Sequence, residues 1–540
     1  MIDDTCSIRN SLATNLRTQK GCTLNRKPTN NQNLSKGIWQ NDAERPRGGL
    51  RDIVYGSVWV IGARWGVRFI GLLSTLILAR LLKPDDFGLV AMGAITVQFL
   101  LVFADAGQDF AVIRNSEASG EHFDTAWTMS VIIGVCVAAI LVAIAPLAGW
   151  YFGDPRAVRV IQILALKPLI NGFTNVGVLN FRKDLQFDRE FIFLVVQRVI
   201  VFLIVVAIAF IYRSYWALII GTLAGELVNV GISYWLHPYR PRFRLSKLRE
   251  ILGYSTWIQF AQIGNFLADR IDQIIVGGIA GTAALGAYNI SEDVASSPTN
   301  EIVFPIARAA FPVYSRLAND LPRLAETYLG VLAISATISL STGFGMALVA
   351  SDFVPIVFGE KWNWIAPLVM WLSIGSGVLG VTRSANMVLA ATANGKLFAL
   401  RNWSFAFLLA LGALFGGTIS GPSGIAAART FAIILFIPAV FVAIQRAIPV
   451  SSRQIVGAIW RPVIATGCMA VAVTVCGSEA PNLIPLRLVE KVAVGAITFA
   501  AASAALWYVI GCPEGPEKIA FMQARNFLVR LVANRKKIRI

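Results

Sequence analysis

Basic side chains inside apolar stretches are the residues of this sequence with the clearest chemistry. A charge at the centre of a bilayer costs roughly 2.5–3.5 kcal/mol even on a lenient insertion scale, so such side chains should face water or protein. Arginine suits phosphate or pyrophosphate because its charge is fixed and its donors are paired. The sequence therefore predicts a cationic cavity that binds an anionic substrate group through seven residues: Arg64, Arg68, Lys167, Arg198, Arg270, Arg383 and Arg429.

A second interpretation is that each base neutralises a carboxylate and only holds helices in register. Arg198, for example, could pair with Glu226. Against this, Arg64 and Arg68 are four residues apart and share one helix face, and Lys167 begins a similar polar stripe. These paired positions favour the cavity, and the ion-pair alternative stays open for any single residue.

Carboxylates also occur within the apolar stretches. Asp269, Asp272, Glu292 and Asp293 are candidates for a coupling-ion site, for Na+ or H+. Neighbouring carboxylates on a wet helix face bind hard cations through oxygen and have shifted proton affinities. The alternative is a structural ion pair, for instance between Asp269 and Arg270.

Catalytic chemistry has little support. The chain has only 2 histidines, so neither a histidine-rich metal site nor a Ser-His-Asp triad is expected. We predict no catalytic residue, no bound metal and no cofactor beyond the coupling cation. The chain is therefore not expected to be an enzyme.

The stretch from Gly253 to Gly286 positions many of these residues. Its polar members recur every three or four residues, as expected for one stripe of a membrane helix that faces a watery cavity. They are Ser255, Gln259, Gln262, Asn265, Asp269 and Asp272. The same stretch repeats the start of the apolar region at a spacing of 198 residues: Ser57, Trp59, Gly66 and Gly88 correspond to Ser255, Trp257, Gly264 and Gly286. The repeat indicates an internal duplication.

The composition is that of an all-α polytopic membrane protein. Of 540 residues, 56% are hydrophobic and 15% are charged, which a soluble globular protein would not need. About 14 transmembrane helices can be placed, since a span needs roughly 20 apolar residues. The runs are 55–79, 87–108, 126–149, 158–179, 190–212, 215–236, 251–276, 284–305, 326–350, 363–390, 403–420, 422–444, 462–478 and 492–511.

The net charge of +17 is explained by topology rather than by nucleic acid. With the amino terminus inside, the inner loops and tails carry several times more Lys and Arg than the outer loops, as the positive-inside rule requires. Both termini are therefore predicted to be cytoplasmic, next to anionic lipids. No loop between the runs is long enough for a soluble catalytic domain of roughly 50 residues or more, which disfavours a polymerase or ligase.

These observations predict five parts along the chain. Residues 1–52 form a disordered cytoplasmic tail, 53–245 a first six-helix bundle, 246–447 a second six-helix bundle, 448–512 helices 13 and 14, and 513–540 a basic cytoplasmic tail.

Several segments resemble the bacterial polysaccharide transporter family, the Wzx-type flippases of the multidrug, oligosaccharidyl-lipid and polysaccharide exporter superfamily. They are LSTLILARLLKPDDFGLVAMGAI (73–95), FADAGQDFAVIR (103–114), DQIIVGGIAGTAALGAYNIS (272–291) and FPVYSRL (311–317). The resemblance implies two six-helix bundles in a V around a central cavity, with two extra carboxyl-terminal helices. It also implies alternating access, with an undecaprenyl-pyrophosphate-linked exopolysaccharide or O-antigen repeat unit as substrate.

The resemblance further implies a place in the bacterial inner membrane, and lipids, polysaccharide polymerase and export machinery as partners. A cation-coupled multidrug exporter of the same superfamily fold is the alternative. Acids and bases within the spans are too similar in number to separate the two.

Overall fold

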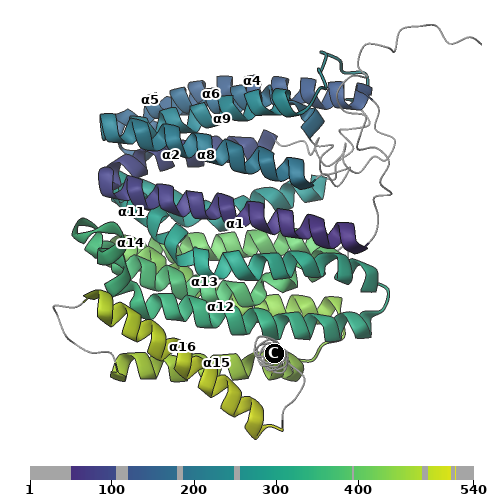
Figure 1. Ribbon diagram of the computed structural model, residues 1–540, viewed down its shortest axis with the longest axis vertical. Coiled ribbons are helices and arrows are strands. Elements are labelled where there is room, and N and C mark those ends of the chain that lie inside the picture. The colour runs from purple at the N-terminus through teal and green to yellow at the C-terminus, as the bar shows by residue number, and fades with distance from the viewer. Residues whose placement is uncertain are drawn as a thin grey trace, which may run out of the picture. The chain divides into compact units, whose positions relative to one another are not determined.

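The computed structural model describes residues 50–104, 120–178, 187–248, 256–391, 395–476, 484–511 and Glu517, and their regular structure is helical (Figure 1). Residues 1–55 form a separate unit from Gly56–Ile540. Most of both predicted tails lies outside the described residues, as does most of the 103–114 motif. The predicted all-α fold class is confirmed.

The first half of the structure, residues 56–248, starts with long helices. They are α1 (Leu50–Leu81), α2 (Pro84–Ala104) and α4 (Gly120–Phe152). The predicted run at 158–179 is not one continuous helix: it is divided into α5 (Pro155–Leu164), α6 (Leu166–Gly172) and the 3-10 turn η2 (Val176–Val178). Pro168 contributes to the break because it lacks a backbone N–H. Then follow α8 (Phe187–Tyr212) and α9 (Trp216–Leu236).

The second half, residues 256–447, contains two helices that continue through a kink. They are α11 (Thr256–Leu317), with Gly281 at φ 79°, and α14 (Gly395–Ala447), kinked at Ser420 and Gly421. Between them lie α12 (Leu321–Phe358), the 3-10 helix η3 (Glu360–Ile365) and α13 (Ala366–Ala391). Each kink falls between two predicted spans.

Helices α15 (Ser452–Cys476) and α16 (Ile484–Val509) follow and both pack on α12, as Figure 1 shows. They correspond to the predicted helices 13 and 14.

Ten helical segments of the described residues are long and apolar enough to cross a membrane. The apolar cores of α8 and α16 are only 6% buried by the rest of the protein, which is expected of surfaces that face lipid. The exact count of 14 spans, the division into two six-helix bundles and the V arrangement stay predictions.

Helix α2 of the first half packs along α11 of the second half. At Gly88 a side-chain methyl would lie 1.7 Å from the carbonyl oxygen of Thr282, and at Gly286 it would lie 2.0 Å from that of Pro84. Pro84 and Thr282 are also 198 residues apart. The two copies of the predicted repeat therefore touch each other reciprocally, each glycine against the backbone of the other copy.

Candidate substrate site

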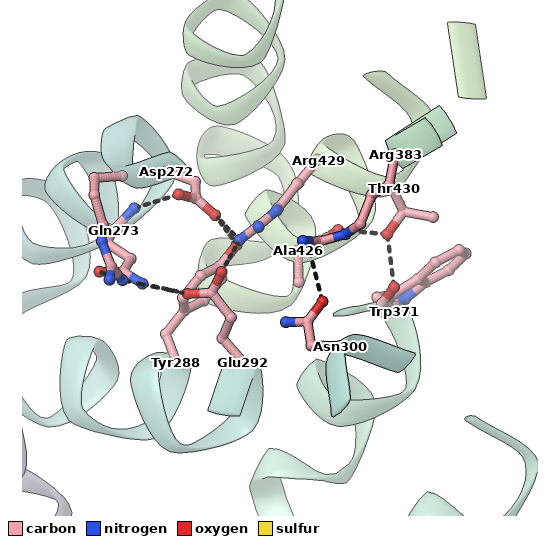
Figure 2. Close-up of polar contacts among 11 residues, drawn as sticks. Asp272, Gln273, Tyr288, Glu292, Asn300, Trp371, Arg383, Ala426, Arg429 and Thr430 are labelled. Atoms are coloured by element: carbon pink, nitrogen blue, oxygen red, sulfur yellow. Dashed lines mark hydrogen bonds and ion pairs between the residues drawn. The ribbon is translucent and has the colours of Figure 1, made fainter. Parts of the chain in front are cut away.

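An ion-paired network lies between α11 and α14, as Figure 2 shows. Arg429 of α14 places Nη1 2.6 Å from Asp272 Oδ2 and 2.8 Å from Glu292 Oε1. Tyr288 donates its hydroxyl proton to Asp272 Oδ2 at 2.6 Å. The Asp272 side chain is 1% exposed and that of Arg429 13%. Arg429 thus neutralises carboxylates, as the structural ion-pair interpretation predicts for a single base. An unpaired charge in this region would be costly.

Arg270 adjoins the same network. Its Nη1 donates to Gln273 Oε1 at 3.2 Å and lies 3.9 Å from Glu292 Oε2. Gln273 also donates to Glu292. The carboxylate that faces Arg270 is therefore Glu292, whereas Asp269 accepts a bond from Asn265 at 3.2 Å.

Arg383 of α13 lies against the second part of α11. Its Nη2 donates to Asn300 Oδ1 at 2.6 Å, and its guanidinium carbon lies 5.5 Å from the centre of the Phe304 ring. An amide oxygen and an aromatic face are therefore among the groups that hold this guanidinium.

Arg68 connects the two halves of the structure. From α1 it reaches α11, where Nη1 lies 3.8 Å from Asp293 Oδ1 and Nε lies 3.3 Å from Glu301 Oε1. It also donates to the hydroxyl of Ser297. The Asp293 side chain is 56% exposed, so this contact is open to solvent. The side chain of Arg64 lies outside the described residues.

A cavity of 440 Å³ lies within the first half, between α1, α6, α8 and α9. Its polar lining includes Lys167, Gln197, Arg198, Thr222 and Glu226. Lys167 Nζ lies 3.6 Å from Glu226 Oε1. The Glu226 carboxylate is therefore next to Lys167, and the expected pair of Arg198 with Glu226 is absent from the described contacts.

Arg198 differs from the other predicted bases. Within the described segments its guanidinium makes no hydrogen bond and no ion pair. It lies beside Gly71, where a methyl group would be 2.9 Å from Nη2, and within electrostatic range of Asp293 and Arg68. The cavity thus holds a cation whose donors remain available to an anion.

Sequence reasoning missed Tyr288 and Gln273. Tyr288 precedes Glu292 by four residues, a spacing that puts both on one helix face, and this was the available signal. Gln273 follows Asp272 directly and donates its backbone N–H to that carboxylate at 2.9 Å. The position of Gln273 in the sequence gave no signal of this role.

Comparison with known proteins shows the family of this chain. Residues 77–367 match the polysaccharide biosynthesis protein family. The chain belongs to this family. The lipopolysaccharide biosynthesis protein WzxC of Escherichia coli K12 is 24% identical over 418 residues, 75% of this chain and 84% of the relative. The succinoglycan biosynthesis transport protein ExoT of Rhizobium meliloti 1021 is 21% identical, over 59% of this chain and 65% of the relative.

Solved structures show the fold of this family member. The lipid II flippase MurJ, in an inward closed conformation, superposes with a TM-score of 0.67 and 13% identity, covering 85% of this chain and 99% of that one. An inward-facing multidrug transporter of the MATE family has a TM-score of 0.55 and 16% identity, covering 71% and 95%. The predicted superfamily fold is therefore confirmed.

Proposed function

We propose that this chain is a flippase for undecaprenyl-pyrophosphate-linked exopolysaccharide or O-antigen repeat units. It moves them from the cytoplasmic to the periplasmic face of the bacterial inner membrane by alternating access, with both of its termini in the cytoplasm. Its family and the polysaccharide systems named for its relatives support the substrate class.

The observation that carries the proposal is Arg198 in its cavity. A pyrophosphate headgroup cannot cross hydrocarbon unless it stays hydrated or fixed cations take the place of its water. The guanidinium donors of Arg198 have no partner among the described residues. The nearby Lys167 shares the Glu226 carboxylate with Asn171, whose Nδ2 donates to it at 3.0 Å. The polyprenyl tail stays in lipid, and no bond of the substrate is made or broken.

The same geometry assigns different roles to the remaining predicted residues. Arg68 reaches from the first half to the second, and a phosphate could compete with Asp293 or Glu301 for its guanidinium. Arg383 lies within the second half, where a phosphate could compete with Asn300. Asp269 and Asp293 are the better coupling-ion candidates, for Na+ or H+, because the carboxylates of Asp272 and Glu292 are already matched by Arg429. A polymerase at the periplasmic face would take up the product.

Replacing Arg198 tests the site. In a deletion strain complemented with Arg198→Gln at equal protein level, we expect polymer output to fall at least about tenfold, since a charged hydrogen bond contributes about 1.5–3 kcal/mol. Lipid-linked repeat units should accumulate on the cytoplasmic leaflet, and Arg198→Lys should restore part of the output.

Arg159→Gln is the matched control, because Arg159 is an exposed arginine of the same half whose side chain lines no part of this cavity. It should leave output near the wild-type level. Normal polymer export in the deletion strain would refute the flippase, and normal export by Arg198→Gln alone would refute this assignment of the headgroup site.

A further inference from the structure

The segment that joins the two halves is fixed to α4. Residues 237–248, which we name the strap, follow α9; the segment begins in extended conformation at His237 and ends in a turn at 246–248. Asp124 Oδ1 accepts the backbone N–H of Arg242 at 2.9 Å, and Thr128 Oγ1 accepts that of Arg244 at 3.0 Å. Asp124 and Thr128 are buried. The path of the strap is therefore set by main-chain donors, independently of its arginine side chains.

Alternate residues of the strap face in opposite directions, as expected for extended chain. The rings of Tyr239 and Phe243 contact α4, where Tyr239 lies 5.8 Å from Phe123 and Phe243 lies 4.7 Å from Trp127 between ring centres. Arg240, Arg242 and Arg244 occupy the even positions and are exposed. The strap thus presents three arginines in a row on the side away from α4.

Local groups neutralise little of this row. Arg244 Nη1 lies 3.8 Å from Glu121 Oε1, with both side chains about half exposed, and such a pair is weak. Arg240 donates to the carbonyl oxygens of His237 and Tyr239 at 2.9 and 3.0 Å, which carry no net charge. Among the described residues, the Arg242 guanidinium has no hydrogen bond or ion pair.

Exposed apolar side chains lie along the same part of the chain. Trp235 is 75% exposed, Phe243 67% and Leu245 44%. Arginines mixed with exposed aromatic rings match the boundary of a bilayer, where the rings enter the interface and the cations meet lipid phosphates. An acidic protein surface would satisfy the charges but would leave the exposed apolar area of Trp235, Phe243 and Leu245 uncovered.

We propose that the strap binds the headgroups of anionic phospholipids through Arg240, Arg242 and Arg244. Because the strap is bonded to α4, this contact anchors the first half of the chain to the leaflet at this end. The second half, which the strap joins by its other end, is left to move relative to the anchor. This inference does not depend on which substrate is transported.

The test uses the full chain in nanodiscs of phosphatidylcholine with increasing phosphatidylglycerol, with the lipid that stays bound after extraction measured by native mass spectrometry. The triple variant Arg240→Gln, Arg242→Gln, Arg244→Gln should retain roughly tenfold less phosphatidylglycerol than wild type, since each arginine at an anionic surface adds to the attraction. Raised salt should abolish the wild-type preference.

A matched triple variant, Arg308→Gln, Arg316→Gln, Arg323→Gln, removes three exposed arginines from the corresponding end of the second half. One of them, Arg323, has an exposed acidic partner in Asp320, as Arg244 has in Glu121. This variant should keep the wild-type retention. Equal losses in the two triples, or no loss in the first, would overturn the proposal. So would lost polymer output with unchanged lipid retention, which would indicate a protein partner instead.

Discussion

Arg429 lies between the carboxylates of Asp272 and Glu292, whereas Arg198 lines a cavity without such partners in the described part of the chain. Both are arginines within apolar sequence, so hydropathy alone does not distinguish them. What separates them is the rotation of each helix and the approach of segments more than a hundred residues away. Those depend on tertiary packing. The bases within apolar helices could therefore be listed from the sequence, but their division into paired and available could not be predicted.

Removing the Arg429 charge should destabilise the protein strongly. Arg429→Gln would leave the buried Asp272 and the partly buried Glu292 without their shared cation, and breaking a buried pair in this way costs about 3–5 kcal/mol. The midpoint of thermal unfolding in detergent, followed by size-exclusion fluorescence, should fall well below that of wild type.

The combined variant Arg429→Gln, Asp272→Asn, Glu292→Gln is the control, because it removes the two opposing charges together with the arginine. It should recover most of the lost stability. If Arg429→Gln unfolds at the wild-type temperature, the structural role of this network is wrong.

At the scale of elements, apolar runs predicted the helices well, since length and hydropathy are local properties. The continuity of neighbouring runs was not predictable in this way. Gly281 and Gly421 leave the helical conformation, yet α11 and α14 continue beyond them, while the run at 158–179 is divided. Such differences depend on which backbone groups find partners in adjacent helices.

The contact between α2 and α11 should be sensitive to single methyl groups. In Gly286→Ala the added carbon would lie 2.0 Å from the Pro84 carbonyl oxygen, so the helices must separate. Overpacking of this kind costs about 1–3 kcal/mol. We expect a lower unfolding midpoint and reduced transport at equal protein level.

Gly345→Ala in α12 is a suitable comparison, because nothing lies within 4 Å of the added methyl. There the substitution should be neutral or stabilising by about 0.5–1 kcal/mol, as for alanine in a helix interior. Equal behaviour of the two variants would show that the close approach at Gly286 is unimportant.

At the scale of the whole unit, one group of contacts joins the halves at the end predicted to be periplasmic. Lys361 donates to the carbonyl oxygens of Arg80 and Leu82 at 3.0 and 2.9 Å, and Trp362 Nε1 donates to that of Ala79 at 3.0 Å. Thr282 donates to Asp154 at 3.1 Å. These hydrogen bonds join the two halves at this end.

The closure at Asp154 should depend on pH in a defined direction. The side-chain hydrogen bond from Arg156 lowers the pKa of Asp154 below its ordinary value of 3.8. A carboxyl with a depressed pKa in the folded state contributes stability above its ordinary pKa and loses it as pH falls through the depressed value. The difference in unfolding midpoint between wild type and Asp154→Asn should thus be constant from about pH 5 to 8 and shrink below about pH 4.

A difference that instead shrinks between pH 6 and 8 would contradict this assignment. Arg156→Gln removes the same hydrogen bond by removing its donor. In the Arg156→Gln background, Asp154→Asn should therefore lower the unfolding midpoint by less at neutral pH than it does in wild type.

The reciprocal contact of Gly88 with Thr282 and of Gly286 with Pro84 is the arrangement that the predicted internal duplication would produce. A peptide of half the length, inserted twice in the same direction, could make this contact as a symmetric homodimer, since each glycine meets the equivalent backbone of the other copy. Joining the copies in one gene then let them diverge. At the spacing of 198, the ion-paired Asp272, Glu292 and Arg429 correspond to Ser74, Ala94 and Gly231, so only one descendant copy carries the charges.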